Sequence, residues 1–339
     1  MQAWFRSGSY SLSPVAETGT RFADFTPYAA SIDDAGNVAF QATLQEGGSG
    51  VYMADGQTIT TMAASGNEFR NVCSHPDING GGAFTFYADL DSGARAVLSG
   101  QGNAMTGLSN SAGPLGPTIN EAGTVAFREG ENGPHSGIFR SSGQSVTTIA
   151  ESGARFRKFH GLPVIGDNGA VTFRADLTTG GEGIYVGDAE RTDTIVETGT
   201  TFTGLGLFPF RSNAGVVAFC ASLRVGGSGV FAVLEGEIAP VVDTDSGFES
   251  FRGVLLDASG RVVFYATPRS GTLGVFSGSD PIRDCVLAVG SSLLGSTVAE
   301  FALNPVSIND AGQLAIRVAL ADGRQAILRA DPEDVMGTD

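Results

Sequence analysis

Apolar and polar residues alternate in short runs along this chain, and one nine-residue phrase recurs seven times. The copies are IDDAGNVAF (32–40), INGGGAFTF (78–86), INEAGTVAF (119–127), IGDNGAVTF (165–173), RSNAGVVAF (211–219), LDASGRVVF (256–264) and INDAGQLAI (308–316). Their turn glycines, at 36, 82, 123, 169, 215, 260 and 312, are spaced by 46, 41, 46, 46, 45 and 52 residues. A period of this length is typical of propellers and solenoids.

Each phrase belongs to a unit of four short strands. A second strand follows it, as in GVYMADG (50–56), then a third, as in TITTMAASG (58–66), and a stretch such as FRKFHGLPVI (156–165) precedes it. Because a four-stranded sheet buries both faces only when neighbours stack on it, the pattern predicts an all-β, seven-bladed propeller. A helical fold is not expected, because no window keeps apolar residues at i, i+3, i+4 and i+7 over three turns.

The two ends of the chain are expected to close the ring together. The segment YSLSPVAETGTRF (10–22) aligns with SVTTIAESGARF (145–156), so it reads as an outer strand without a blade. The last blade ends at QAILRAD (325–331) and lacks that strand. We therefore expect 10–22 to complete it, which removes an exposed sheet edge. Residues 1–331 then form one propeller, and 332–339 form a C-terminal tail.

These repeats resemble a family of bacterial proteins with tandem "INDxGxVAF" blades, and the resemblance covers nearly the whole chain. It implies a propeller and is weak evidence for function, because propellers support binding, scaffolding and catalysis alike. The chain is also distantly similar to the propeller half of a cyanobacterial alkylating enzyme, without that enzyme's calcium-binding partner domain. No residue is carried over from either resemblance.

Charge and cysteine content restrict the partners. A net charge of −16 argues against nucleic acid and anionic membranes, which require basic surfaces. Lys158 is the only lysine among 20 basic residues, so nearly all fixed cations are arginines, which bind anions in a bidentate manner. Cys73, Cys220 and Cys285 form no CxxC pair, which argues against disulfides and structural zinc. We expect a cytoplasmic protein, with a removed signal peptide as the alternative.

The acidic residues of the phrase have a simple interpretation as turn residues. Glycine supplies a positive φ there, and the Asp or Asn side chain accepts hydrogen bonds from nearby backbone amides. This interpretation applies to Asp33, Asp34, Asp167, Asp257 and Asp310. A calcium site is the alternative, but the alternating ligands of a D-x-D-x-D-G loop are missing.

The positions at which the seven copies differ are the candidates for function. Counting from each turn glycine as zero, position +5 carries Gln41, Tyr87, Arg128, Arg174, Cys220, Tyr265 and Arg317. If the hairpin is centred near −1, these residues face position −7, which carries Ala29, His75, Gly116, Leu162, Phe208, Gly253 and Pro305. Glycine opposite Arg128 and Tyr265 leaves room for those side chains to reach inward.

This pattern predicts a mouth of the ring lined by arginine, tyrosine and histidine. The predicted ligand-binding residues are Arg70, Arg128, Arg157, Arg174, Arg211, Arg252, Arg317 and Tyr28, and the predicted catalytic residues are Tyr87, Tyr265, His75 and His160. Such a mouth suits a carboxylate, phosphate, sulfate or phenolate. The alternative is that these arginines lie between blades, where they stack on aromatic rings and bond carbonyl groups.

Three functions follow. We favour a small-molecule-binding propeller, leaning toward an enzyme with lyase or transferase-like acid/base chemistry on an anionic or phenolic ligand, without a cofactor. One alternative is a non-catalytic interaction or glycan-binding scaffold. The other is a metal-dependent lyase in which His75, His135 and His160 hold a divalent metal. Cys220 is a nucleophile only if its pKa is lowered, and otherwise a small buried hydrophobe. The oligomeric state stays open.

Overall fold

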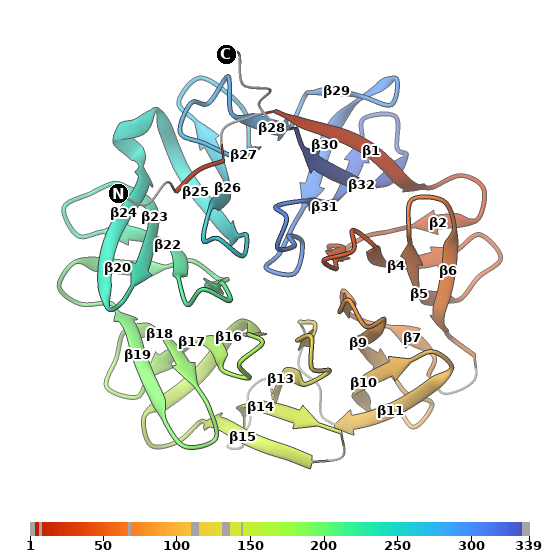
Figure 1. Ribbon diagram of the computed structural model, residues 1–339, viewed down its shortest axis with the longest axis horizontal. Helices are drawn as coiled ribbons and strands as arrows, with labels where there is room; N and C mark the ends of the chain where they lie inside the picture. The colour runs from red at the N-terminus through yellow and green to blue at the C-terminus, as the bar shows by residue number, and fades with distance from the viewer. Residues whose placement is uncertain are drawn as a thin grey trace.

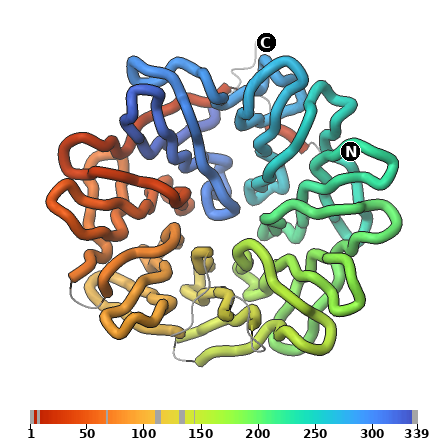
Figure 2. Tube along the Cα trace, turned by 180° about the vertical axis from the view of Figure 1, so that it is seen from behind, coloured from red at the N-terminus to blue at the C-terminus, as the bar shows by residue number. Residues whose placement is uncertain are grey.

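The computed structural model describes residues 4–6, 9–66, 69–109, 115–130, 136–143 and 145–333. Within these residues the chain forms seven antiparallel sheets arranged as blades around a central axis, so the predicted seven-bladed propeller is confirmed (Figure 1). The view from behind shows the same closed ring (Figure 2). Helical structure in the described part is limited to one 3-10 turn, η1 (Thr244–Ser246). No helix there is long and apolar enough to cross a membrane.

The strands of the first four blades are as follows. Blade 1 contains β2 (Phe22–Asp24), β3 (Ser31–Ile32), β4 (Val38–Leu44), β5 (Ser49–Ala54) and β6 (Ile59–Ala64). Blade 2 contains β7 (Asn71–Val72), β8 (Asp77–Ile78), β9 (Ala83–Asp89), β10 (Arg95–Gln101) and β11 (Ala104–Ser109). Blade 3 contains β12 (Thr118–Ile119), β13 (Val125–Glu129), β14 (Gly137–Ser142) and β15 (Ser145–Glu151). Blade 4 contains β16 (Phe156–Ile165), β17 (Val171–Leu177), β18 (Glu182–Gly187) and β19 (Thr192–Glu197).

The remaining strands complete the ring. Blade 5 contains β20 (Phe202–Leu205), β21 (Phe210–Arg211), β22 (Val217–Leu223), β23 (Ser228–Leu234) and β24 (Glu237–Asp243). Blade 6 contains β25 (Phe248–Leu256), β26 (Val262–Pro268), β27 (Gly274–Phe276) and β28 (Cys285–Ala288). Blade 7 contains β29 (Ser292–Leu293), β30 (Ser296–Ala302), β31 (Leu314–Leu320), β32 (Gln325–Pro332) and β1 (Tyr10–Glu17).

The N-terminal strand closes the ring as predicted. β1 pairs antiparallel with β32, from Tyr10 opposite Pro332 to Glu17 opposite Ala326. The segment before it also joins blade 6, where the Val262 amide donates to the Trp4 carbonyl at 2.7 Å. β32 ends at Pro332, one residue inside the predicted tail. Residues 334–339 of that tail lie outside the described part.

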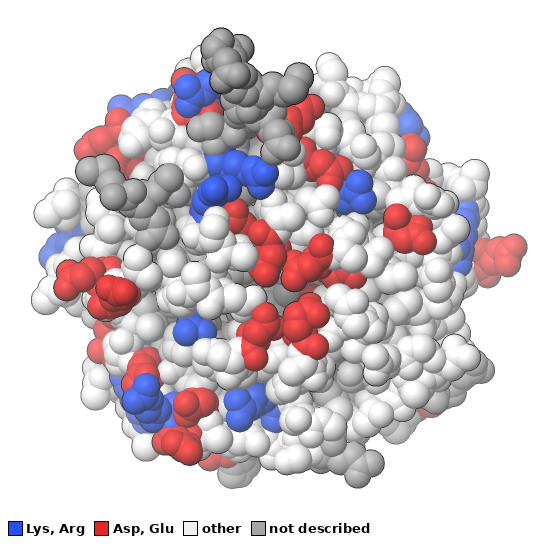
Figure 3. Space-filling model, in the orientation of Figure 1, with Lys and Arg blue, Asp and Glu red and all other residues white. Residues whose placement is uncertain are grey.

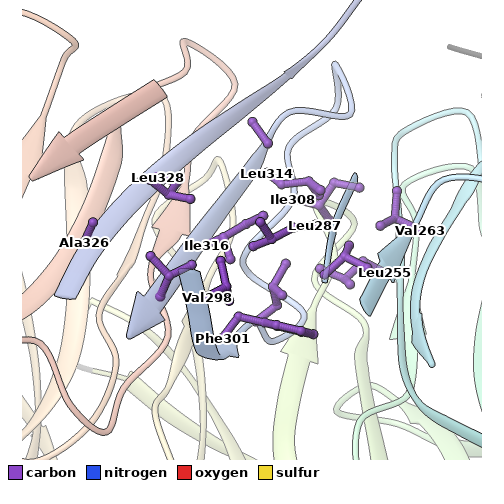
Figure 4. Packing of buried hydrophobic residues seen from close by; sticks show 14 of the residues in the cluster. Leu255, Val263, Leu287, Val298, Phe301, Ile308, Leu314, Ile316, Ala326 and Leu328 are labelled. Carbon is purple, nitrogen blue, oxygen red and sulfur yellow. The ribbon is translucent and has the colours of Figure 1, made fainter. Parts of the chain in front are cut away.

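The hydrophobic core lies between adjacent blades. Val38, Ala39 and Phe40 of β4 are all buried, which explains why the end of the phrase reads as a continuous apolar run rather than an alternating one. Figure 4 shows this packing between blades 6 and 7, where Leu255 of blade 6 and Ile316 of blade 7 belong to one cluster of buried aliphatic side chains. Each blade buries a face only because its neighbour covers it, as stacked repeats require.

The predicted pairing of position +5 with position −7 is correct in blade 6 and wrong in blades 4 and 7. In blade 6, Tyr265 faces Gly253, and a β-carbon at Gly253 would overlap the tyrosine ring. In blade 4, Arg174 faces His160, two residues further from the turn than predicted, and in blade 7 Arg317 faces Ala302, three residues further. The register of β16 shifts between His160 and Val164. A bulge adds residues to one strand of a pair, so constant spacing from the turn does not hold.

Candidate functional site

In five of the seven phrases, the side chain three positions before the glycine accepts hydrogen bonds from backbone amides of the turn. In blade 1, Asp33 Oδ1 accepts hydrogen bonds from the amides of Ala35 (3.0 Å) and Asn37 (2.8 Å). In blade 6, Asp257 Oδ1 accepts from the amides of Ser259 (2.9 Å) and Arg261 (3.0 Å). The interpretation of Asp33 and Asp257 as turn residues is confirmed.

Asparagine at this position, −3, also joins neighbouring blades. Asn79 Nδ2 donates to the Asn120 carbonyl at 3.0 Å, and Asn120 Nδ2 donates to the Gly166 carbonyl at 3.1 Å. Across the closure of the ring, Asn309 Nδ2 donates to the Asp33 carbonyl at 2.8 Å. Aspartate cannot make these bonds because an ionised carboxylate only accepts. The asparagine copies therefore hold the turns side by side around the axis.

The next residue, at position −2, has a different environment. This position carries Asp34, Gly80, Glu121, Asp167, Asn213, Ala258 and Asp310. Its carboxylates reach to the preceding blade, where Glu121 Oε1 accepts from the Gly80 amide (2.9 Å) and Asp167 Oδ1 from the Glu121 amide (3.0 Å). Asp34 Oδ1 accepts from the Asp310 amide at 2.8 Å in the same way. The interpretation as turn residues is therefore incomplete for position −2, whose carboxylates form a rim around the axis.

This rim surrounds an open axial pocket with a volume of about 130 Å³. Figure 3 shows acidic side chains gathered around the central opening on this face. Below the rim lies position −4, which we call the collar and which carries Ile32, Ile78, Ile119, Ile165, Arg211, Leu256 and Ile308. Deeper lining residues include Asp77, Thr118, Val164 and Phe210. The pocket is acidic at its opening and mainly apolar below it.

The charges at the rim influence one another. Partial burial, and then the charges of Asp34, Asp167, Asp257 and Glu121, raise the pKa of Asp310 to about 6. Among the described residues, no hydrogen bond to the Asp310 carboxylate is found, although its amide bonds Asp34. Burial is the largest cause of this shift, and the neighbouring carboxylates add to it because like charges disfavour ionisation.

Two buried polar groups lie lower in the pocket. Asp77 is only 5% exposed, and its carboxylate accepts from the amides of Ile78 (2.9 Å) and Ile119 (2.8 Å). Burial raises the pKa of Asp77 to about 7, a rise that the two amide hydrogen bonds oppose and Glu121 increases. Ser212 is 3% exposed, and its hydroxyl has no hydrogen-bond partner in the described part of the chain.

Of the residues predicted at a ligand site, Arg211 lines this pocket, and several others lie between blades. The Tyr87 hydroxyl donates to the Arg128 carbonyl (3.1 Å) and accepts from the Arg128 amide (3.2 Å). Arg128 Nη1 donates in turn to the Phe159 carbonyl of blade 4 at 2.7 Å. Burial raises the pKa of Tyr87, which opposes its ionisation.

Other predicted arginines have partners within their own blades. Arg317 Nη2 donates to Glu300 at 2.6 Å, and Arg70 Nε donates to the Leu90 carbonyl at 3.1 Å. Arg211 differs, because its Nη1 donates to Asn168 Oδ1 of the preceding blade at 3.4 Å. These contacts match the alternative in which arginines bond carbonyls and carboxylates of the scaffold. Their roles at a ligand stay predictions.

The other predicted residues are dispersed. His75 is buried beside Gly116, its Nε2 has no partner among the described residues, and burial lowers its pKa to about 4. Burial also raises the pKa values of Tyr265 and Tyr28. Arg252 is exposed.

Blade 4 brings three of the predicted residues together. His160 Nε2 lies 2.8 Å from Asp176 Oδ1, and Arg157 Nη2 lies 2.8 Å from Asp176 Oδ2. Arg174, paired with Glu182, faces His160 across the sheet. Burial lowers the pKa of His160, and Asp176 opposes that shift.

The metal and cysteine hypotheses have less structural support. No group of three His, Cys, Asp or Glu side chains suited to a metal ion is found among the described residues, and His135 lies outside them. All three cysteines are unpaired, as predicted. Burial raises the pKa of Cys220 to about 12, which agrees with a small buried hydrophobe.

Solved structures similar to this chain are also propellers. An oligogalacturonate lyase in complex with manganese is 11% identical (TM-score 0.58, covering 96% of this chain and 99% of that one), and the oligogalacturonate lyase from Vibrio parahaemolyticus is 11% identical (TM-score 0.59, 96% and 98%). A puromycin-hydrolyzing peptidase from Mycobacterium tuberculosis is 13% identical (TM-score 0.56) and covers all of this chain and 57% of that one. Such low identities show a shared fold alone.

No curated protein matches the sequence. A family of unknown function, DUF7453, matches residues 2–227, and the chain belongs to this family.

Proposed function

We propose that this protein binds a small molecule with a positively charged group in the axial pocket. The observation that carries the proposal is the imbalance of charge in the lining. Among the described residues that line the pocket, Arg211 is the one basic residue, whereas the acidic ones are Asp33, Asp34, Asp77, Glu121, Asp167, Asp257 and Asp310. A concave site lined by one sign of charge concentrates the field and attracts ligands of the opposite sign.

The rest of the pocket suits an organic cation. The collar offers aliphatic contact to the body of a ligand, as small-molecule sites generally do. Ser212 belongs to the lining, and its hydroxyl, which has no hydrogen-bond partner among the described residues, offers a hydrogen bond. A buried hydroxyl without a partner costs free energy, and a ligand that bonds it recovers that cost.

The proposal is tested with two ligands of similar shape and opposite charge. Pentylamine and pentanoate carry opposite charges on the same alkyl chain, and calorimetric titration measures both. We expect pentylamine to bind and pentanoate not to bind. Asp310→Asn should weaken pentylamine about tenfold, because removing a nearby opposite charge costs about 1.4 kcal/mol. Asp55→Asn is the matched control, since Asp55 lies in an exposed turn away from the pocket. Stronger binding of pentanoate would refute the proposal.

A second candidate retains the acid/base chemistry on an anionic or phenolic ligand. It is supported by the hydrogen bond between His160 and Asp176, with Arg157 and Arg174 nearby. A carboxylate that orients a histidine is a common arrangement for a general base, and arginine binds the ligand's anion. Two of the structurally similar proteins are oligogalacturonate lyases, so oligogalacturonate is the ligand to test. Formation of an unsaturated product that His160→Gln abolishes would support it, and no product from the unmodified protein would remove it.

A further inference from the structure

The axial pocket has carboxylates at two depths. The first set is the rim at position −2, and the second is Asp77, which stands at position −5 on the inner strand of blade 2. Asp77 lies on β8, whereas position −2 of the same blade lies in the turn that follows, so position −4 stands between the two sets along the chain.

Apart from Arg211, the region between these levels is apolar. Six of the seven collar residues are isoleucine or leucine, and all six are buried. A single ammonium group at the rim would leave the collar and Asp77 unused. An unbranched chain would fit the narrow space of about 130 Å³ better than a ring, since larger ligands occupy pockets of about 300 Å³ or more.

Asp77 retains capacity for a ligand. An ionised carboxylate offers about four acceptor positions, and the amides of Ile78 and Ile119 occupy two of them. Ser212 of the same lining is 3% exposed, and its hydroxyl has no hydrogen-bond partner among the described residues, which is an independent observation in favour of a polar ligand. Neighbouring carboxylates add to the effect of burial in raising the pKa of Asp310, as expected where like charges lie close together.

We infer that the ligand is a linear diamine, with one ammonium group at the carboxylate rim, its methylenes against the collar, and the second ammonium group at Asp77. This inference rests on the proposed cation site and specifies its ligand class. The rim binds the first charge at the opening, and the collar removes the chain from water. Each buried methylene strengthens binding by up to about fourfold.

The experiment compares three ligands with the same five-carbon chain by calorimetric titration of the full chain. They are 1,5-diaminopentane, pentylamine and 5-aminopentan-1-ol. We expect the diamine to bind about tenfold more tightly than either monoamine, because only the diamine pairs with Asp77. Asp77→Asn should lower diamine affinity about tenfold, to the value for pentylamine. Asp55→Asn should leave all three affinities unchanged.

The outcomes separate this inference from the proposed function. Equal affinities for the diamine, the monoamine and the amino alcohol would overturn the diamine and retain the cation site. Absence of binding by all three ligands would overturn both. If Asp77→Asn does not fold, the comparison of diamine with amino alcohol on the unmodified protein still decides the question, because these two ligands differ only in the second charge.

Discussion

At the scale of single residues, two adjacent aspartates of one turn have different roles. Asp33 is buried and fully used by its own turn, whereas Asp34 is exposed at the axial rim. Aspartate is common in turns, so residue type alone predicts the role of Asp33 in its turn and does not predict the place of Asp34 at the rim. The ring arrangement decides the second role, because it places position −2 of every blade at the same opening.

Asp310→Asn should stabilise the protein in a pH-dependent way. The pKa of Asp310 is raised from 3.8 to about 6, so its contribution to stability is complete below about pH 4 and is lost as pH rises through 6. Asparagine does not titrate. Above pH 6 the variant should therefore be more stable by about 1 kcal/mol or less, because solvent screens this exposed group.

Urea unfolding at pH 4.5 and pH 7.5 measures this effect. The advantage of the variant should be present at pH 7.5 and largely absent at pH 4.5. Asp55→Asn is again the control, since the pKa of Asp55 is lowered, chiefly by its backbone hydrogen bonds. A difference in stability that does not change with pH would contradict the raised pKa of Asp310.

At the scale of strands, the sequence predicts the strand after the turn well and the inner strand poorly. The VAF-type segments are buried on both faces, so their apolar runs are unambiguous. The inner strand is interrupted, as in blade 1, where β2 and β3 both pair with β4. Spacing from the turn therefore located Gly253 opposite Tyr265 and misplaced the partners of Arg174 and Arg317.

Arg128→Ala should lower stability by about 2 kcal/mol and leave binding in the axial pocket unchanged. Arg128 is 8% exposed and bonds the Phe159 carbonyl of the next blade, so its loss leaves a buried acceptor without this partner. Arg157→Ala is the control, because its side chain is 66% exposed and its ion pair with Asp176 contributes about 1 kcal/mol or less. Urea unfolding and pentylamine titration test both variants. Lost binding with unchanged stability would instead support the sequence-based role of Arg128 at a ligand.

At the scale of the whole molecule, the repeat explains why the fold is predictable and the site is not. Seven copies of the phrase predict the ring, and the ring places the seven residues of any one repeat position around the axis. The copies differ at position +5, which predicts a ligand site there, but all three arginines at that position contact the scaffold. Position −2 shows four carboxylates among the copies, but their convergence appears only once the turns are placed at one end of the ring.

Closure of this ring by β1 leads to a prediction about chain order. Deleting residues 1–17 should sharply lower the melting temperature and cause self-association, because the edge of β32 becomes exposed. A circular permutant should restore both properties. In the native fold the Glu333 amide donates to the Ser9 carbonyl at 2.8 Å, so these two residues are close enough for a two-residue Asn-Gly turn to join them. The permuted chain would begin at Gly19, run to Glu333, and continue through this turn into residues 9–18. Light scattering and thermal unfolding compare the three proteins. If the permutant were as unstable as the deletion, the pairing of β1 with β32 would not be what closes the ring.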